Sequence, residues 1–138
     1  MKTIYDTPIT DFISRGVETV KLTDPVKLAA QRYKSSPLQI LLATNDDGRL
    51  AGVITDNDLT KLLDMKPDQE VRELATTHDV VAIRPDTELW QLLKIINGEN
   101  ARNMPLNAIP VVDEEKRPIG VVTRDSLRRL LPKTLAET

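Results

Sequence analysis

The chain has 138 residues, of which 40% are hydrophobic and 29% are charged, a balance typical of a globular domain with a sizeable core. A formal net charge of −2 and an aromatic content of 3% argue against the basic surfaces and stacking platforms of nucleic-acid-binding proteins. The absence of cysteine excludes disulfides and thiolate metal sites and indicates a cytoplasmic location, and no stretch approaches the ~20 apolar residues of a membrane span.

Short strands and helices alternate through the first half of the chain. Apolar residues at helical spacing predict the helices, and alternating or continuous apolar runs predict the strands. The turn at Asn45 to Gly48 joins two strands into a hairpin, and Thr55 stands at the start of the helix that follows. The predicted elements are a leading helix, a strand, a helix, two strands and a helix, at residues 7–13, 17–22, 26–34, 39–44, 50–54 and 55–63.

The second half repeats this order after a linker at residues 64–69. It carries an insertion at Gly98 to Met104 and ends in a frayed tail after Pro132. Its predicted elements are a leading helix, a strand, a helix, two strands and a helix, at residues 71–75, 80–83, 89–96, 107–113, 119–122 and 123–131.

One stretch shows that the two halves are related. Leu50 to Leu59 (LAGVITDNDL) recurs 68 residues later as Pro118 to Leu127 (PIGVVTRDSL). In each copy a strand ends on a Thr, Thr55 or Thr123, that is placed to cap the next helix, and such helix starts attract anions. A period longer than ~50 residues is not that of a solenoid. We therefore predict a duplicated domain, with a lead-in and first repeat in residues 1–66 and a linker helix, second repeat and tail in residues 67–138.

The repeated motifs resemble those of a pair of cystathionine-β-synthase (CBS) domains, the tandem called a Bateman module. The resemblance covers roughly residues 17 to 131 and is carried by VxLTDP, DVVAIRPDT, NAIPVVD, GVITDND and GVVTRDS, which begin at residues 20, 79, 107, 52 and 120. It implies a mixed α/β (α+β) fold of two pseudo-twofold-related repeats, each strand-helix-strand-strand-helix, with the sheets packed together and the helices outside. It also implies two clefts between the repeats that bind AMP, ADP, ATP or a related adenosyl ligand as an effector, a homodimer, and a regulated enzyme or transporter. No cofactor is required.

In the first repeat, Asp58 lies one helical turn after Thr55. An ionised carboxylate only accepts hydrogen bonds and can take both hydroxyls of a ribose cis-diol, while the Thr55 hydroxyl can meet ribose or phosphate. The alternative is that Thr55 and Asp58 form a capping box for the helix and bind no ligand. The family resemblance favours the ligand role.

The second repeat departs from the family pattern, because Ser126 stands where the family has Asp. A hydroxyl cannot bind a diol as a carboxylate does, so a nucleotide is expected to be held there more weakly or differently. Arg124, beside Thr123, can pair with phosphate, or it is an ordinary solvated surface residue. We therefore expect the cleft that uses Asp58 to be the better nucleoside site.

The remaining candidate residues come from strand starts and from strand–helix turns. Gln39-Ile40 and Asn107-Ala108-Ile109 align with family positions whose backbone reads the adenine edge, although the isoleucine side chains fit plain sheet core. Thr23, Asp24 and Arg84 lie at the first strand–helix turns, where relatives contact phosphate or ribose. For Thr23 and Asp24, capping of the next helix is an equal explanation.

The sequence shows no constellation for catalysis or metal binding. His78 is the only His, and the chain contains no HExxH, Walker loop or GxGxxG motif. We predict a regulatory module, not an enzyme, that senses an adenine nucleotide. The alternative is a structural or dimerising module of a larger transporter, channel or protease whose clefts bind nothing, and the altered second motif favours it.

Overall fold

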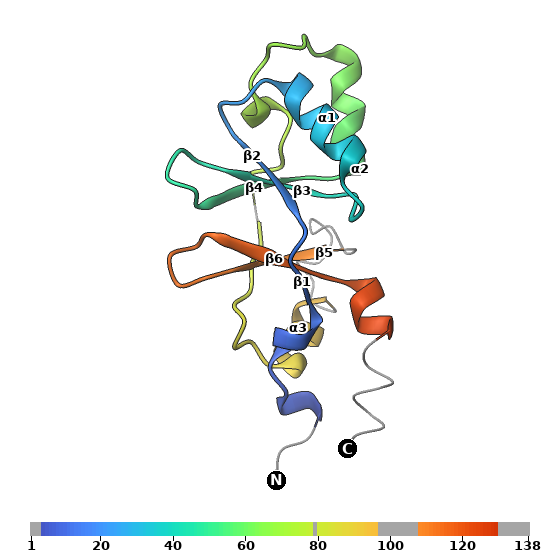
Figure 1. Ribbon diagram of the computed structural model, residues 1–138, viewed down its shortest axis with the longest axis vertical. Helices are drawn as coiled ribbons and strands as arrows, with labels where there is room; N and C mark the ends of the chain where they lie inside the picture. Colours follow the sequence, from blue (N-terminus) through green and yellow to red (C-terminus); the bar gives the residue numbers. More distant parts are fainter. Residues whose placement is uncertain (1–3, 79, 97–107, 130–138) are drawn as a thin grey trace. The chain divides into compact units, whose positions relative to one another are not determined.

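The computed structural model describes residues 4–78, 80–96 and 108–129 (Figure 1). The chain divides into two compact units, each with its own three-stranded sheet. The N-repeat unit comprises Gly16–Val80 and Glu115–Pro118, and the C-repeat unit comprises Met1–Arg15, Val81–Glu114 and Ile119–Thr138. None of the helices in the described ranges is long and apolar enough to cross a membrane. The predicted mixed α/β fold is confirmed.

The N-repeat unit follows the predicted order of elements. Its sheet has the order β2–β3–β4, built from Glu18–Lys21, Leu41–Thr44 and Leu50–Ile54, with β3 parallel to β2 and antiparallel to β4. Parallel neighbours need a crossover connection, which α1 (Val26–Ser35) supplies. After β4 comes the short helix α2 (Asp56–Leu59), which continues as the 3-10 turn Thr60–Asp64. Both α1 and α2 contact the strands of this sheet (Figure 1).

The C-repeat unit contains a sheet of order β1–β6–β5, built from Ile13–Ser14, Pro118–Thr123 and Ala108–Val112. β1 pairs antiparallel with β6, so that Ile13 lies opposite Val122. The helix α3 (Leu89–Ile96) precedes β5 in the chain, and residues 124–129 are helical directly after β6. The predicted insertion at residues 98–104 and the predicted tail lie outside the described residues.

The strand predicted at residues 80–83 is wrong, because among its described residues only Ile83 pairs, as an isolated parallel bridge to Val111. The Ile83 N–H donates to the Pro110 carbonyl at 2.9 Å, and the Val112 N–H donates to the Ile83 carbonyl at 2.8 Å. The next rung toward the start of the segment would need an N–H from residue 110, and proline has none. The parallel ladder therefore ends at Ile83.

Each unit takes in the leading segment that precedes the other repeat. The first leading segment forms the 3-10 turn Ile9–Phe12 in the C-repeat unit, where the Ile9 N–H donates to the Thr87 carbonyl at 2.9 Å. The second forms the 3-10 turn Val71–Glu73 in the N-repeat unit, where the Val71 N–H donates to the Asp24 carbonyl at 2.8 Å. The compact units therefore differ from the sequence repeats, because both leading segments are exchanged. The division of the repeats between residues 66 and 67 stays a prediction.

The exchanged segments contribute side chains to both cores. Ile9 and Phe12 are buried in the core of the C-repeat unit, and Val71 and Leu74 are buried in that of the N-repeat unit. The other buried residues of the C-repeat core are Ile83, Leu89, Leu92, Ile109, Val111, Val122 and Leu127. The other buried residues of the N-repeat core are Val20, Val26, Ala29, Leu41, Ala43, Ile54 and Ala75.

Two equivalent glycines allow the exchanged segments to approach the sheets closely. A Cβ at Gly120 would overlap the Ser14 carbonyl oxygen, and a Cβ at Gly52 would lie 2.9 Å from the Thr76 carbonyl oxygen. Ser14 belongs to β1, which pairs with β6, and Thr76 forms an antiparallel bridge with Val53. The glycines of the repeated GVIT and GVVT motifs are therefore required by close backbone contact.

We expect Gly120→Ala to lower the free energy of unfolding by about 2 kcal/mol or more, because the added methyl group forces β1 away from β6. Gly16→Ala is the matched control, since a Cβ at Gly16 meets nothing within 4 Å. The control should change stability by less than about 0.5 kcal/mol. Urea unfolding followed by circular dichroism measures both variants, and equal stabilities would contradict the docking of β1 beside Gly120.

Candidate functional site

The strand register of the N-repeat unit decides which candidate residues come together. Leu41, the first residue of β3, lies opposite Ile54, the last residue of β4. Gln39-Ile40 and Thr55 therefore lie at the same end of the sheet, together with Asp58. In contrast, Lys21 at the end of β2 pairs with Thr44, so Thr23-Asp24 follow at the opposite end. Within this unit the predicted residues divide into two separate groups.

Thr55 and Asp58 form the capping box that the sequence offered as the alternative interpretation. Asp58 Oδ2 accepts hydrogen bonds from the Thr55 backbone N–H at 2.9 Å and from the Thr55 hydroxyl at 3.2 Å. The Asp58 residue is only 5% exposed, although it carries an ionisable group. A carboxylate buried to this extent needs hydrogen-bond donors from the protein or from a ligand.

The second oxygen of Asp58 has two further donors. Asp58 Oδ1 accepts from the Thr76 hydroxyl at 2.8 Å and from the Lys61 ammonium at 3.3 Å. Lys61 also donates to the Leu74 carbonyl at 3.2 Å, and its side chain is 49% exposed. A carboxylate offers about four lone-pair sites. All of them are therefore engaged, and a ligand hydroxyl can reach this carboxylate only by replacing one of the four donors.

The start of α2 presents acceptors more than free donors. The Asn57 N–H donates to Asp56 Oδ1 at 3.0 Å, and the Asp58 N–H donates to the Thr55 carbonyl at 3.0 Å. The first turn is acidic, and α2 extends only from Asp56 to Leu59 before the 3-10 turn begins. A short helix with two carboxylates in its first turn does not match the anion site that the sequence predicted at this position.

Gln39 precedes β3 with a φ of 55°, a left-handed conformation that is uncommon for a residue other than glycine. The Tyr33 hydroxyl donates to the Gln39 carbonyl at 2.9 Å and holds this turn against the end of α1. Burial raises the pKa of Tyr33, and the negative charge of Asp56 raises it further. Ile40 beside Gln39 is buried, so its side chain belongs to the core and only its backbone remains a candidate for a ligand role. Its carbonyl accepts from the Ser36 hydroxyl at 3.2 Å.

The equivalent cap of the C-repeat unit is neutral. Ser126 is 2% exposed, and its backbone N–H donates to the Thr123 hydroxyl oxygen at 3.0 Å. The two hydroxyl oxygens are 2.9 Å apart, and the Ser14 hydroxyl lies 3.2 Å from that of Ser126. Arg124 follows the cap as an exposed residue. Hydroxyl groups replace the carboxylate here, so this cap has neither the charge nor the paired acceptors of Asp58.

The predicted residues at the start of β5 are only partly described. Ala108 and Ile109 are buried, whereas Asn107 lies outside the described residues. The side chains of Ala108 and Ile109 are part of the sheet core, as the alternative interpretation of the sequence expected for Ile109.

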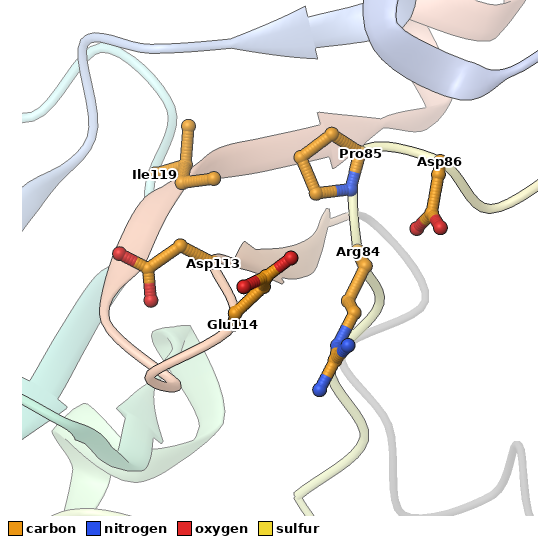
Figure 2. Close-up of a pocket in the computed structure, with 6 residues that line it drawn as sticks. All are labelled: Arg84, Pro85, Asp86, Asp113, Glu114 and Ile119. Atoms are coloured by element: carbon orange, nitrogen blue, oxygen red, sulfur yellow. The ribbon is translucent and has the colours of Figure 1, made fainter.

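Arg84 lies apart from Thr123 and Arg124. Ile83 pairs in parallel with Val111, so Arg84 follows at the end of the sheet where β5 ends. A hollow of about 320 Å³ opens there (Figure 2) and is lined by Arg84, Pro85, Asp86, Asp113, Glu114 and Ile119. Among the residues that the structure describes, no group of three His, Asp or Glu side chains could hold a metal ion. The lining of this hollow combines the basic Arg84 with acidic side chains and includes none of the cap residues.

The two strand–helix turns use their polar residues locally. Asp24 Oδ2 accepts from the Lys21 N–H at 2.8 Å, while the N-cap of α1 is Pro25, which has no side-chain cap. The Thr87 hydroxyl accepts from the Arg84 N–H at 3.1 Å. Helix capping by Thr23 or Asp24 was therefore the wrong alternative for α1, and Asp24 closes the turn itself.

Sequence reasoning missed three residues that contact the caps: Ser14, Lys61 and Thr76. Ser14 and Thr76 each follow a leading segment, and each brings a hydroxyl group to the residue three positions after a cap Thr. The signal available in the sequence was a hydroxyl residue shortly before the predicted strands at 17–22 and 80–83 in both repeats. The exchange of the leading segments hides this relation from any local pattern.

The sequence model of the CBS domain family matches residues 9–64 and 71–133, which together make up most of the chain. The chain therefore belongs to the CBS domain family, and its two repeats form a tandem CBS pair.

Homoserine O-acetyltransferase of Methanohalobium evestigatum is 27% identical to the chain over 125 residues, which cover 91% of this chain and 24% of that protein. The chain thus spans about a quarter of the length of the first curated relatives that it matches. A CBS domain pair solved in complex with 5′-methylthioadenosine and S-adenosyl-L-methionine has a TM-score of 0.72 and 24% identity, covering 92% of this chain and 97% of that one. CBSX2 in complex with AMP has a TM-score of 0.71 and 23% identity, covering 91% and 96%. These two structures share the fold of the chain.

We expect Tyr33 to titrate above its usual pKa of 10.0, because burial and then the charge of Asp56 disfavour the phenolate. A raised pKa in the folded state means that the stabilising contribution is present below the unfolded value and is lost as the pH rises through the folded value. A titration followed by phenolate absorbance should show a transition above the usual value, and Tyr33→Phe should remove that transition. A transition that persists unchanged in Tyr33→Phe would contradict this environment for Tyr33.

Proposed function

We propose that the chain is a regulatory CBS pair that binds an adenosyl nucleotide of the AMP, ADP or ATP type, and that it is not itself an enzyme. The observation that carries the proposal is the buried carboxylate of Asp58, which lies at the same end of the sheet as the Gln39-Ile40 backbone. Asp58 accepts hydrogen bonds from ribose, and the Gln39-Ile40 backbone reads the base. The solved CBS pairs that contain AMP or S-adenosyl-L-methionine support this class of ligand.

The donors around Asp58 suggest how a ribose diol enters. The Thr55 hydroxyl and the Lys61 ammonium make the longest of the four contacts, at 3.2 and 3.3 Å. A hydroxyl can rotate to another partner, and the half-exposed Lys61 retains both water and the Leu74 carbonyl. These two donors are therefore the least costly to replace by ligand hydroxyls.

The other candidate residues have smaller roles in this proposal. Thr123 and Arg124 offer a hydroxyl group and a guanidinium without a neighbouring carboxylate at position 126, which suits the phosphate end of a ligand. Asn107, Ala108 and Ile109 contribute backbone groups to the base in the second repeat. The turn residues Thr23, Asp24 and Arg84, which are separate from the cap residues, are secondary candidates for contacts with ribose or phosphate. A homodimer, a regulated enzyme or transporter and a cytoplasmic location belong to the same proposal.

A structural or dimerising module is the second candidate, and one observation favours it. Asp58 is fully satisfied by the chain itself, and Ser126 at the equivalent position is bonded to Thr123 and Ser14. Both caps are thus stable without a ligand. The two candidates differ in whether nucleotides change the stability of the chain.

We expect AMP, ADP, ATP or S-adenosyl-L-methionine to raise the melting temperature, with about 2.7 kcal/mol of stabilisation at a hundredfold excess over Kd. Asp58→Ala should lose most of this ligand-induced shift, because it removes the acceptors for the diol. Asp56→Ala is the matched control, since it removes an exposed carboxylate from the same helical turn and should retain the shift.

Differential scanning fluorimetry measures each variant with and without ligand, so that the intrinsic effect of a substitution on stability cancels. A melting temperature unchanged by all four ligands would favour the structural module. A full shift in Asp58→Ala would show that a ligand binds elsewhere.

A further inference from the structure

Thr76 is fixed in place more firmly than an ordinary surface threonine. Its N–H donates to the Val53 carbonyl at 2.9 Å, and its carbonyl accepts from the Val53 N–H at 3.0 Å. The missing side chain of Gly52 leaves room for this approach, and the buried Val71 and Leu74 anchor the segment just before it. The backbone of Thr76 is therefore held against β4, and its hydroxyl reaches Asp58 Oδ1 at 2.8 Å, the shortest of the four contacts.

The C-repeat unit repeats this geometry with different residues. Ser14 belongs to β1, which pairs with β6 beside Gly120. Its hydroxyl lies 3.2 Å from that of Ser126, the equivalent of Asp58. In both units, a hydroxyl from an exchanged segment thus contacts the residue three positions after the cap Thr. Only in the N-repeat unit is that residue a carboxylate.

The four donors to Asp58 divide evenly between its two oxygens. On Oδ2, the Thr55 backbone N–H is fixed, and the Thr55 hydroxyl can rotate away. On Oδ1, the Thr76 hydroxyl makes the shortest contact, at 2.8 Å, from a backbone held against β4, and the Lys61 ammonium can leave for solvent. Each oxygen therefore has one firm donor and one replaceable donor. The two hydroxyls of a cis-diol need one acceptor site on each oxygen, which is what departure of the replaceable donors leaves.

We propose that Thr76 is a positioning residue that orients the Asp58 carboxylate for a ligand with a cis-diol, and that it thereby makes the N-repeat site select ribonucleotides over ligands that lack the diol. This inference rests on the proposed function of Asp58. Thr76 does not contact the ligand; it keeps the plane of the carboxylate fixed while the Thr55 hydroxyl and Lys61 give way. The same selection is absent from the C-repeat unit, because Ser126 has a single oxygen.

The test compares AMP with 2′,3′-dideoxy-AMP by isothermal titration calorimetry. We expect the unaltered chain to prefer AMP, and we expect Thr76→Val to weaken AMP binding about tenfold, the effect of losing one hydrogen bond to a charged group. Binding of 2′,3′-dideoxy-AMP should stay the same in Thr76→Val. Thr76→Ser should restore AMP binding, because it returns the hydroxyl group.

Thr77→Val is the matched control, because the adjacent exposed threonine receives the same substitution. Thr76→Ala provides a second variant without the hydroxyl if Thr76→Val does not fold. Equal weakening of both nucleotides, or undiminished preference for AMP in Thr76→Val, would overturn the positioning role while leaving the proposed function in place. Failure of the unaltered chain to bind AMP would overturn the positioning role, and failure with ADP, ATP and S-adenosyl-L-methionine as well would overturn both proposals. An AMP preference that Asp58→Ala retains would also overturn both.

Discussion

The close contact between each exchanged leading segment and a glycine of the neighbouring strand is the constraint on which both units depend. The contact brings Ser14 against Gly120 and Thr76 against Gly52. Backbone hydrogen bonds between strands need this approach, and a side chain at either glycine would prevent it. The same contact delivers buried apolar residues to each core and a hydroxyl group to each cap. Core packing and the geometry of the candidate site therefore have a common origin.

The two caps show how one backbone arrangement supports different chemistry. In the N-repeat unit, a carboxylate is buried, and four donors offset the loss of its hydration. In the C-repeat unit, Ser126 needs no counter-charge, and two hydroxyl groups satisfy it. The two caps therefore differ in charge at one equivalent position, although both place a residue three positions after a cap Thr in contact with a hydroxyl from an exchanged segment.

Much of the fold could be predicted from the sequence because its signals are local. The apolar run before Asn45, the hairpin turn and the cap Thr55 each fix an element through nearby residues, and the structure confirms the hairpin of β3 and β4. The strand predicted before Arg84 does not form, because Pro110, a residue far along the chain, cannot donate to the ladder. A pattern of apolar residues at 80–83 contains no information about this partner.

The candidate site was predictable in part for the same reason. Thr55 and Asp58 are three residues apart, so their capping box follows from spacing alone. Thr76 lies 18 residues from Asp58, and Ser14 lies 112 residues from Ser126. These contacts require knowledge of which unit receives each leading segment. A short apolar turn fits either core equally well by composition, so only the three-dimensional pairing decides.

The exchange of leading segments also bears on how this chain arose. In this chain the leading segment of each repeat packs in the core of the other repeat. A polypeptide with one repeat in the same arrangement would have needed a second copy to complete its core. A duplicated chain supplies both copies of the leading segment, so that both cores are completed within one molecule. Once joined, the two copies were free to diverge, and the aspartate of one and the serine of the other record that freedom.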